Sequence, residues 1–161
     1  MKDPFFYKFN CKTNPEELLA YEEKNRHQYF SVSGFEMFLI PKELIKDHPL
    51  MDVVEKFNGA PYLLKLEPWT FLDFHVDTNR TCTINSLLTG FDSHTYFTYD
   101  KHNLLRFNII PLYYTLGSCY LFNTKQWHGV ANHTERRVNL SISFASNAYR
   151  EILEYCQQKN L

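Results

Sequence analysis

Four residues of this chain have types and spacing that suit chemistry at a bound ion. His75 and Asp77 are two residues apart, so on a β-strand their side chains share one face. His128 lies far downstream, and Arg137 follows it by nine residues. Two imidazoles and one carboxylate on one face of a divalent ion such as Fe(II) leave other positions open. Arg137 adds a planar, permanently charged fork that suits the far carboxylate of a dicarboxylic co-substrate.

Both metal motifs have plainer interpretations. His75 and Asp77 also fit a surface histidine followed by a turn, because residues 77–80 have turn composition. His128 also fits a core histidine with a satisfied hydrogen bond. The polar surroundings of His94 and His102 predict solvent exposure, and His133 lies in a loop. The histidines that compete with the two candidates are His27, His48, His94, His102 and His133.

Arg137 begins an alternating strand on its polar side. An inward-facing arginine needs an anion, because an unpaired buried charge is expensive. A salt bridge with Glu135 is the structural alternative. If the strand already includes Arg136, alternation sends that side chain the opposite way, to solvent, although the choice between Arg136 and Arg137 as the anchor stays open.

Other polar groups lie near these motifs. Thr81, Thr83 and Asn85 share one strand face, which either contacts a co-substrate or is an ordinary outer polar face. Arg80 either binds a substrate carboxylate or is a solvated turn residue. A further set of aromatic residues is expected in the core and at the rim: Tyr113, Tyr114 and Tyr120.

The composition limits the class of protein. The 161 residues, 44% hydrophobic and 17% aromatic, predict one folded domain. A net charge of −1 gives no broad basic field for a phosphate backbone, which argues against a nucleic-acid partner. No apolar run has the length of a signal peptide or a membrane span. The four cysteines form no Cys-X-X-Cys pair, so we expect reduced thiols and a cytoplasmic location. The richness in Asn, Lys, Phe and Tyr with few Gly suits an AT-rich genome. If that genome is viral, the expected location is the host cytoplasm.

The ends of the chain read as helical. Asn14 and Pro15 predict a cap and first turn of a helix that runs to about Asn25. A second helical stretch lies within 41–57, interrupted around 47–49 by proline and ended by Asn58-Gly59. A last helix is expected from Asn147 to about Lys159.

The middle of the chain, about 61–144, reads as strands. In the last one, Val138, Leu140 and Ile142 share one face, and polar residues share the other. Eight short strands predict a mainly β fold, a double-sheet jelly roll, with flanking helices in a single domain over 1–161. The expected strands are Tyr62–Leu66, Thr70–Val76, Thr81–Leu88, Thr95–Tyr99, Leu105–Tyr114, Cys119–Asn123, His128–Asn132 and Arg136–Phe144.

These motifs together resemble the aspartyl/asparaginyl β-hydroxylase-like branch of the Fe(II)/2-oxoglutarate oxygenases. The resemblance covers about half of the chain. It implies a cupin-like double-stranded β-helix in which His75, Asp77 and His128 bind iron, Arg137 binds the 5-carboxylate of 2-oxoglutarate, and Asn85 lies near this co-substrate. The segments that carry it are His75–Arg80 with Ile84-Asn85, Leu116-Gly117 with Phe122-Asn123, His128–Asn132 and Arg137–Leu140.

The chain departs from the family in three respects. Its His-to-Arg spacing of nine is about one residue shorter than the family's, which leaves open whether Arg136 or Arg137 is the anchor. The family's best-known animal members lack the carboxylate of the first metal motif, so Asp77 brings this chain closer to bacterial members, including free-proline hydroxylases. At 161 residues it is also short, so its substrate-binding elements are minimal or come from a partner.

The resulting prediction is a hydroxylase of a free amino acid or a peptidyl side chain that uses Fe(II), 2-oxoglutarate and O₂. Its substrate would be a small molecule, peptide or protein, with neither nucleic acid nor membrane as a partner. Two alternatives are a non-catalytic, cupin-like metal- or ligand-binding protein and an oxygenase acting on a nucleobase.

Overall fold

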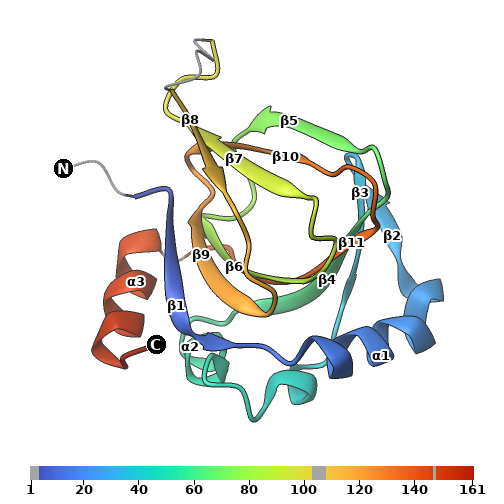
Figure 1. Ribbon diagram of the computed structural model, residues 1–161. Coiled ribbons are helices and arrows are strands. Elements are labelled where there is room, and N and C mark those ends of the chain that lie inside the picture. The colour runs from blue at the N-terminus through green and yellow to red at the C-terminus, as the bar shows by residue number, and fades with distance from the viewer. Residues whose placement is uncertain (1–3, 103–107, 147) are drawn as a thin grey trace.

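In the computed structural model, which describes residues 4–102, 108–146 and 148–161, two antiparallel sheets face each other (Figure 1). In spatial order the larger sheet contains β1 (Phe6–Lys12), β9 (Ser118–Asn123), β6 (Cys82–Thr89), β11 (Arg137–Phe144), β4 (Ala60–Leu66), β3 (Phe35–Leu39) and β2 (Phe30–Val32). The smaller sheet contains β5 (Phe71–His75), β10 (Trp127–Ala131), β7 (His94–Thr98) and β8 (Ile109–Leu112). This arrangement confirms the predicted jelly roll.

All eight predicted strands are present, with ends that differ by a few residues. The expected strand Leu105–Tyr114 corresponds to β8, and its first residues lie outside the described part of the chain. The expectation that the N-terminal region holds only helices is wrong, because β1, β2 and β3 lie there. β1 pairs with β9, more than a hundred residues away, and β2 has three residues, so neither has a strong local pattern.

The predicted helices are largely confirmed. The side chain of Asn14 caps α1 (Pro15–Asn25) by accepting a hydrogen bond from the Glu16 backbone N–H at 3.2 Å. The second stretch is divided, as expected, into a 3₁₀ turn, η2 (Lys42–Ile45), and α2 (Met51–Lys56). The last helix is α3 (Tyr149–Gln158); its expected start at Asn147 lies outside the described residues. A further 3₁₀ turn, η1 (Arg26–Gln28), follows α1.

The two faces of the larger sheet have different partners. Its outer face packs against the helices, and Val138, Leu140 and Ile142 of β11 lie in that main core. Its inner face lines the space between the sheets, where Arg137 and Asn139 lie. The predicted alternation of β11 is therefore confirmed. Among the described residues, no helix is both long and apolar enough to span a membrane.

Candidate functional site

Strand pairing brings the two candidate histidines together. His128 of β10 is the cross-strand partner of His75 at the end of β5, and their ring centroids are 4.4 Å apart. Asp77 follows β5, with carboxylate oxygens 3.7 Å from Nε2 of His75 and 4.0 Å from Nε2 of His128. One potential ligand atom from each residue lies within 4.8 Å of the others. Neighbouring ligands of one ion at about 2.1 Å are roughly 3 Å apart, so small side-chain shifts are enough to fit a metal.

Both imidazoles are held in the tautomer that leaves Nε2 free. Nδ1 of His75 lies 2.7 Å from the carbonyl oxygen of Asp73, and Nδ1 of His128 lies 2.9 Å from that of Gln126. A carbonyl only accepts, so each Nδ1 carries the proton and each Nε2 keeps its lone pair. Burial lowers the pKa of His128 to about 4, so this imidazole is neutral at pH 7. A neutral imidazole binds metal ions through the lone pair of a ring nitrogen, here Nε2.

A glycine permits the close approach of β5 and β10 at the two histidines. A Cβ on Gly129 would lie 2.9 Å from the carbonyl oxygen of Leu72 and 3.4 Å from backbone atoms of β5. Backbone cannot move aside as a flexible side chain can. Any larger residue here must therefore push the two strands apart next to His128.

We accordingly expect Gly129→Ala to destabilise the fold by about 1–3 kcal/mol, the usual cost of overpacking. In a domain of this size that lowers Tm by about 2–12 °C. Thermal unfolding followed by circular dichroism measures it. Wild-type stability of Gly129→Ala would show that β5 and β10 are farther apart in solution than in this structure.

Arg80 contacts the candidate ligand Asp77 and lines the same pocket as the two histidines. Its Nε donates to Oδ2 of Asp77, and its Nη1 donates to Oγ of Ser143 at 3.2 Å. The backbone N–H of Asp77 donates to the carbonyl oxygen of Thr124 at 3.0 Å, which fixes the turn. The arrangement supports a role for Arg80 in holding the candidate ligand Asp77. Arg80 is therefore not freely solvated, and its side chain also lines both spaces at the site, the inner pocket and a wider hollow beside it.

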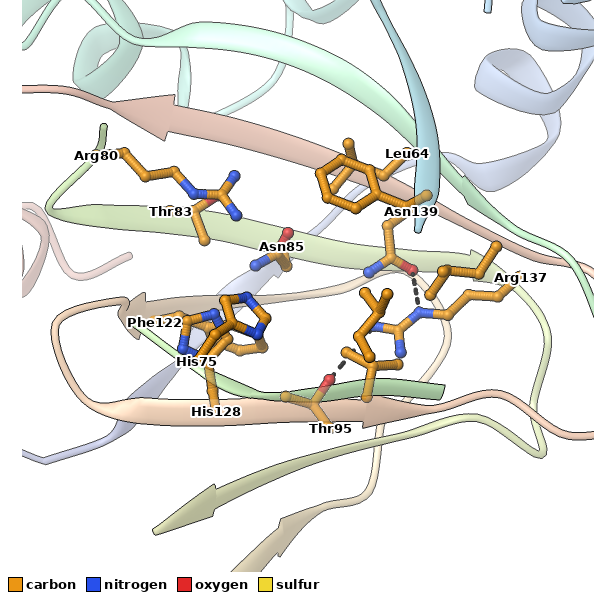
Figure 2. A pocket seen from close by; sticks show the side chains of 14 residues that line it. Leu64, His75, Arg80, Thr83, Asn85, Thr95, Phe122, His128, Arg137 and Asn139 are labelled. Carbon is orange, nitrogen blue, oxygen red and sulfur yellow. Dashed lines mark hydrogen bonds between the residues drawn. The ribbon is translucent and has the colours of Figure 1, made fainter. Parts of the chain in front are cut away.

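Arg137 lies at the opposite end of the same pocket from the histidines (Figure 2). Its side chain is buried, with 4% of the residue exposed. Its hydrogen-bond partners are all neutral: Oδ1 of Asn139 at 3.2 Å, Oγ of Ser93 at 2.7 Å, Oγ1 of Thr95 at 3.4 Å and the Tyr114 hydroxyl at 3.0 Å. No carboxylate of the described chain lies within ion-pair distance, so the alternative of a Glu135 salt bridge is not observed. A buried cation without a counter-charge favours binding of an anion.

Arg136 has a different environment. It points to the other side of β11, as predicted, but it is not simply solvated. Its Nη1 and Nη2 contact both carboxylate oxygens of Glu22 at 2.7 and 3.1 Å, and Glu22 is 1% exposed. The expectation that Arg136 faces solvent is therefore wrong, because α1 covers this side of the sheet and supplies an acid.

The three polar residues predicted to share a strand face, Thr81, Thr83 and Asn85, make different contacts. Asn85 lines the pocket between His75 and Arg137 (Figure 2). Thr83 also lines it, but its hydroxyl already contacts Oγ of Ser141 at 2.8 Å and the Ile142 carbonyl at 3.0 Å. The Thr81 hydroxyl donates to the Phe144 carbonyl oxygen at 3.2 Å, and Thr81 does not line this pocket. Asn85 is thus the best placed of the three to meet a ligand.

Three residues around Arg137 were not among the predicted site residues. Tyr114 was expected to be a core or rim aromatic, whereas its hydroxyl contacts the guanidinium of Arg137. Ser93 and Thr95 flank His94 in a segment that reads as an ordinary turn and strand. Nothing local in the sequence marks these hydroxyls, since β7 and the end of β8 come together only in the folded sheet.

Of the remaining predictions for aromatic residues and histidines, most are confirmed and the one for His94 is wrong. Tyr113 is exposed and Tyr120 is buried, as expected for the rim and the core. His102 is exposed, as predicted, and His133, which was expected in a loop, is exposed too. His94 is instead half-buried, because its ring packs against Tyr113 and His133 at centroid distances of 5.3 and 6.0 Å.

Two spaces share the side chain of His75. The inner pocket between His75 and Arg137 holds about 600 Å³ of space, part of it open to solvent. A wider hollow of about 1740 Å³, largely open, shares His75 and Arg80 with the pocket and extends past the turn between β2 and β3. The site can therefore hold a small anion inside and present a larger molecule at His75.

The comparisons with known proteins agree on the fold. No family model and no curated sequence matches the chain. Among solved structures, a prolyl-4-hydroxylase from Pseudomonas putida has a TM-score of 0.65 at 10% identity, covering 89% of this chain and 94% of its own. HygX from Streptomyces hygroscopicus, with nickel, 2-oxoglutarate and hygromycin B bound, has a TM-score of 0.60 at 11% identity, covering 88% and 82%. This chain has their fold.

A third match extends the likeness. A prolyl hydroxylase from Trichoplax adhaerens, in complex with a hypoxia inducible factor peptide fragment, has a TM-score of 0.65 at 13% identity, covering 92% of this chain and 86% of its own. These neighbours support the wider 2-oxoglutarate oxygenase fold. They do not support the narrower aspartyl/asparaginyl β-hydroxylase branch, since the hydroxylases among them act on proline.

Proposed function

We propose that this protein is an Fe(II)/2-oxoglutarate-dependent dioxygenase that hydroxylates an amino-acid or peptidyl side chain. The observation that carries the proposal is the pairing of two features in one pocket. At one end, two imidazoles direct their Nε2 atoms toward a carboxylate. At the other end, a buried arginine has only neutral partners. A dicarboxylate that spans the pocket would satisfy both.

The metal-binding role falls to His75, Asp77 and His128. Bound iron would supply the reaction with O₂ that converts 2-oxoglutarate into succinate and CO₂ and hydroxylates the substrate. The backbone carbonyls of residues 73 and 126 orient the two imidazoles. Asp77 offsets part of the ion's charge, while Arg80 holds one of its carboxylate oxygens and so fixes the direction of the other.

Arg137 would bind the 5-carboxylate of 2-oxoglutarate, and its neighbours prepare it for this task. The Nε–H of Arg137 donates to Asn139, and its terminal N–H groups donate to the hydroxyls of Ser93, Thr95 and Tyr114. The guanidinium is therefore held in position before a ligand binds. Asn85 and Thr83 would lie beside the co-substrate. The apolar walls of the pocket exclude water from the reacting centre, and they include Leu64, Leu66, Leu72, Phe122 and Val130.

The wide hollow beyond His75 favours a peptidyl substrate over a free amino acid. It extends well past the triad, along Phe71 and Asp73 of β5 and the turn at Ser33 and Gly34. A free amino acid would leave most of this space to water. The peptide bound to the Trichoplax adhaerens neighbour and the hygromycin B bound to HygX are also larger than one amino acid.

The decisive experiment adds 2-oxoglutarate to the protein and Fe(II) without oxygen. Direct chelation should produce a visible metal-to-ligand charge-transfer band. Succinate release in air, with a panel of peptides and amino acids, then identifies the substrate class. A protein that binds iron but shows neither the band nor succinate release would instead be a cupin-like binding protein.

The Tyr114 hydroxyl provides a milder test of the carboxylate end. Tyr114→Phe removes one hydrogen bond to Arg137 and keeps the ring that lies 5.0 Å from the guanidinium carbon. We expect 2-oxoglutarate binding to weaken about 2- to 10-fold, which corresponds to one hydrogen bond of about 0.5–1.5 kcal/mol. An anaerobic titration measures it. Tyr113→Phe, at the exposed neighbour, should leave the affinity unchanged.

A further inference from the structure

A pair of thiols lies between the first strand and the rest of the larger sheet. β1 and β9 are antiparallel, with Lys8 opposite Tyr120 and Lys12 opposite Ser118, so Cys11 and Cys119 both lie in the stretch between these two pairs, where the register shifts. The Thr13 backbone N–H donates to the Gly117 carbonyl oxygen at 2.8 Å, which fixes the same register. The two sulfur atoms lie within 4.8 Å of each other.

His48 completes a possible three-ligand metal cluster with these thiols, but its nitrogens are already occupied. Nδ1 accepts a hydrogen bond from the Leu50 backbone N–H at 3.1 Å, so the proton of the neutral ring is on Nε2. Nε2 lies 3.0 Å from the Lys12 carbonyl oxygen and donates to it. Binding a metal would break one of these bonds, which leaves the two thiols as the reactive groups of the cluster.

The two thiols have complementary environments. Cys11 is half-buried and reachable by a small oxidant, whereas Cys119 is fully buried. The Cys119 thiol donates to the Gly117 carbonyl oxygen at 3.8 Å. The contact between the two thiols lowers the pKa of Cys11 and, together with burial, raises the pKa of Cys119. A thiolate is the nucleophile in thiol–disulfide exchange, so Cys11 is suited to react first and Cys119 to follow.

We propose that Cys11 and Cys119 form a reversible disulfide that joins β1 to β9 under oxidising conditions. The oxidant is a low-molecular-weight disulfide such as glutathione disulfide. The Cys11 thiolate attacks one of its sulfurs and displaces one glutathione thiolate. Cys119 then attacks Sγ of Cys11, loses its proton and displaces the second glutathione. Two protein thiols are oxidised and one disulfide is reduced to two thiols.

The bond would stabilise the fold without altering the pocket. Alternation along β9 places Cys119 in the main core and Tyr120 on the opposite, inner face. The bridge closes a loop of 119 − 11 = 108 residues. Loops of this length give a large entropic stabilisation, and we expect Tm to rise by about 5–15 °C. The proposal is therefore independent of iron or 2-oxoglutarate binding.

The test incubates the native full-length chain in glutathione buffers of increasing oxidised fraction, with a chelator present. Free thiols are then blocked, and the protein is digested with trypsin without reduction. The expected product links peptide 9–12 to peptide 107–125 and disappears on reduction. Cys11→Ser should abolish both the linked product and the rise in Tm. As this residue is half-buried, the variant should fold, which its circular dichroism spectrum verifies.

The other two cysteines provide matched controls. Cys82 and Cys156 are fully buried, and burial raises the pKa of each to about 12. Cys82→Ala and Cys156→Ala should keep the linked product. Three results would overturn the proposal: no linked product, a stable glutathione adduct on Cys11 that Cys119 never displaces, or equally abundant links through peptides 81–101 and 151–159. Tight binding of one equivalent of Zn²⁺ that Cys11→Ser removes would show a metal site instead.

Discussion

Replacing Asp77 by Ala should abolish iron-supported turnover and leave the fold intact. The carboxylate is the one anionic member of the candidate triad, and it lies 3.7 and 4.0 Å from the two Nε2 atoms. Changes to residues that only support metal ligands cost 10- to 100-fold in metal affinity, so loss of a ligand should weaken Fe(II) binding by at least about 100-fold. Asp77→Asn should bind iron poorly as well, because the amide lacks the negative charge.

The fold should tolerate the change because Asp77 belongs to neither apolar cluster. Its loss leaves Arg80 without one partner, but Arg80 keeps Ser143 and partial access to water. We expect a stability change on the order of 1 kcal/mol. Asp73→Ala is a matched control, since that exposed carboxylate lies on the same strand and the backbone carbonyl that orients His75 remains.

Two measurements decide the outcome for Asp77. Anaerobic Fe(II) titration gives the affinity, and 2-oxoglutarate decarboxylation without substrate gives the activity of the centre. If Asp77→Ala keeps wild-type activity, the carboxylate is not a ligand, and a site formed by two histidines becomes the better model.

How much of this site the sequence predicts depends on how local its signals are. His75 ends β5 and Asp77 lies two residues later, just past the strand, so the two side chains are close in space because they are close in sequence. The alternation of β11 is also local, because its apolar side meets the helices while Arg137 and Asn139 meet the pocket. Such contrasts between two faces can be read from a single segment.

The parts that could not be predicted depend on pairing between distant segments. The hydroxyls around Arg137 come from Ser93, Thr95 and Tyr114, and only the registers of β7, β8 and β11 bring them together. Likewise, Arg136 finds Glu22 only because α1 covers the outer face of β11. The strand β1 has a weak pattern of its own and is stabilised by pairing with β9. Non-local contacts of this kind leave little trace in local composition.

The second large effect is expected at the other end of the pocket, where Arg137→Ala should weaken 2-oxoglutarate binding by roughly 10- to 150-fold. A paired, charge-assisted contact contributes on the order of 1.5–3 kcal/mol, which gives this range. Arg137→Lys should recover only part of the affinity, because it keeps the charge but loses the planar fork that Ser93, Asn139 and Tyr114 hold in place. Metal binding itself should be unchanged in both variants.

Arg136→Ala is the matched comparison, and the structure predicts an opposite pattern for it. Its two contacts with Glu22 lie on the far side of β11 from the pocket. Truncating it leaves a buried carboxylate without its main partner, although Arg26 contacts the same residue at 3.4 Å. We expect a loss of stability of about 3 kcal/mol, the usual cost of breaking a buried pair, with an unchanged 2-oxoglutarate affinity.

The pair of variants therefore separates binding from folding. The measurements are the dissociation constant for 2-oxoglutarate, taken anaerobically with metal present, and the free energy of unfolding in urea. If Arg136→Ala loses the co-substrate and Arg137→Ala binds it normally, then β11 is out of register by one residue. If both variants bind it normally, the buried cation serves another anion, and the metal-binding protein without turnover becomes the better description. Because Arg137 has no acidic partner among the described residues, its removal leaves no buried carboxylate unpaired, and we expect it to cost less stability than Arg136→Ala. That contrast would indicate that the charge of Arg137 is there for a ligand.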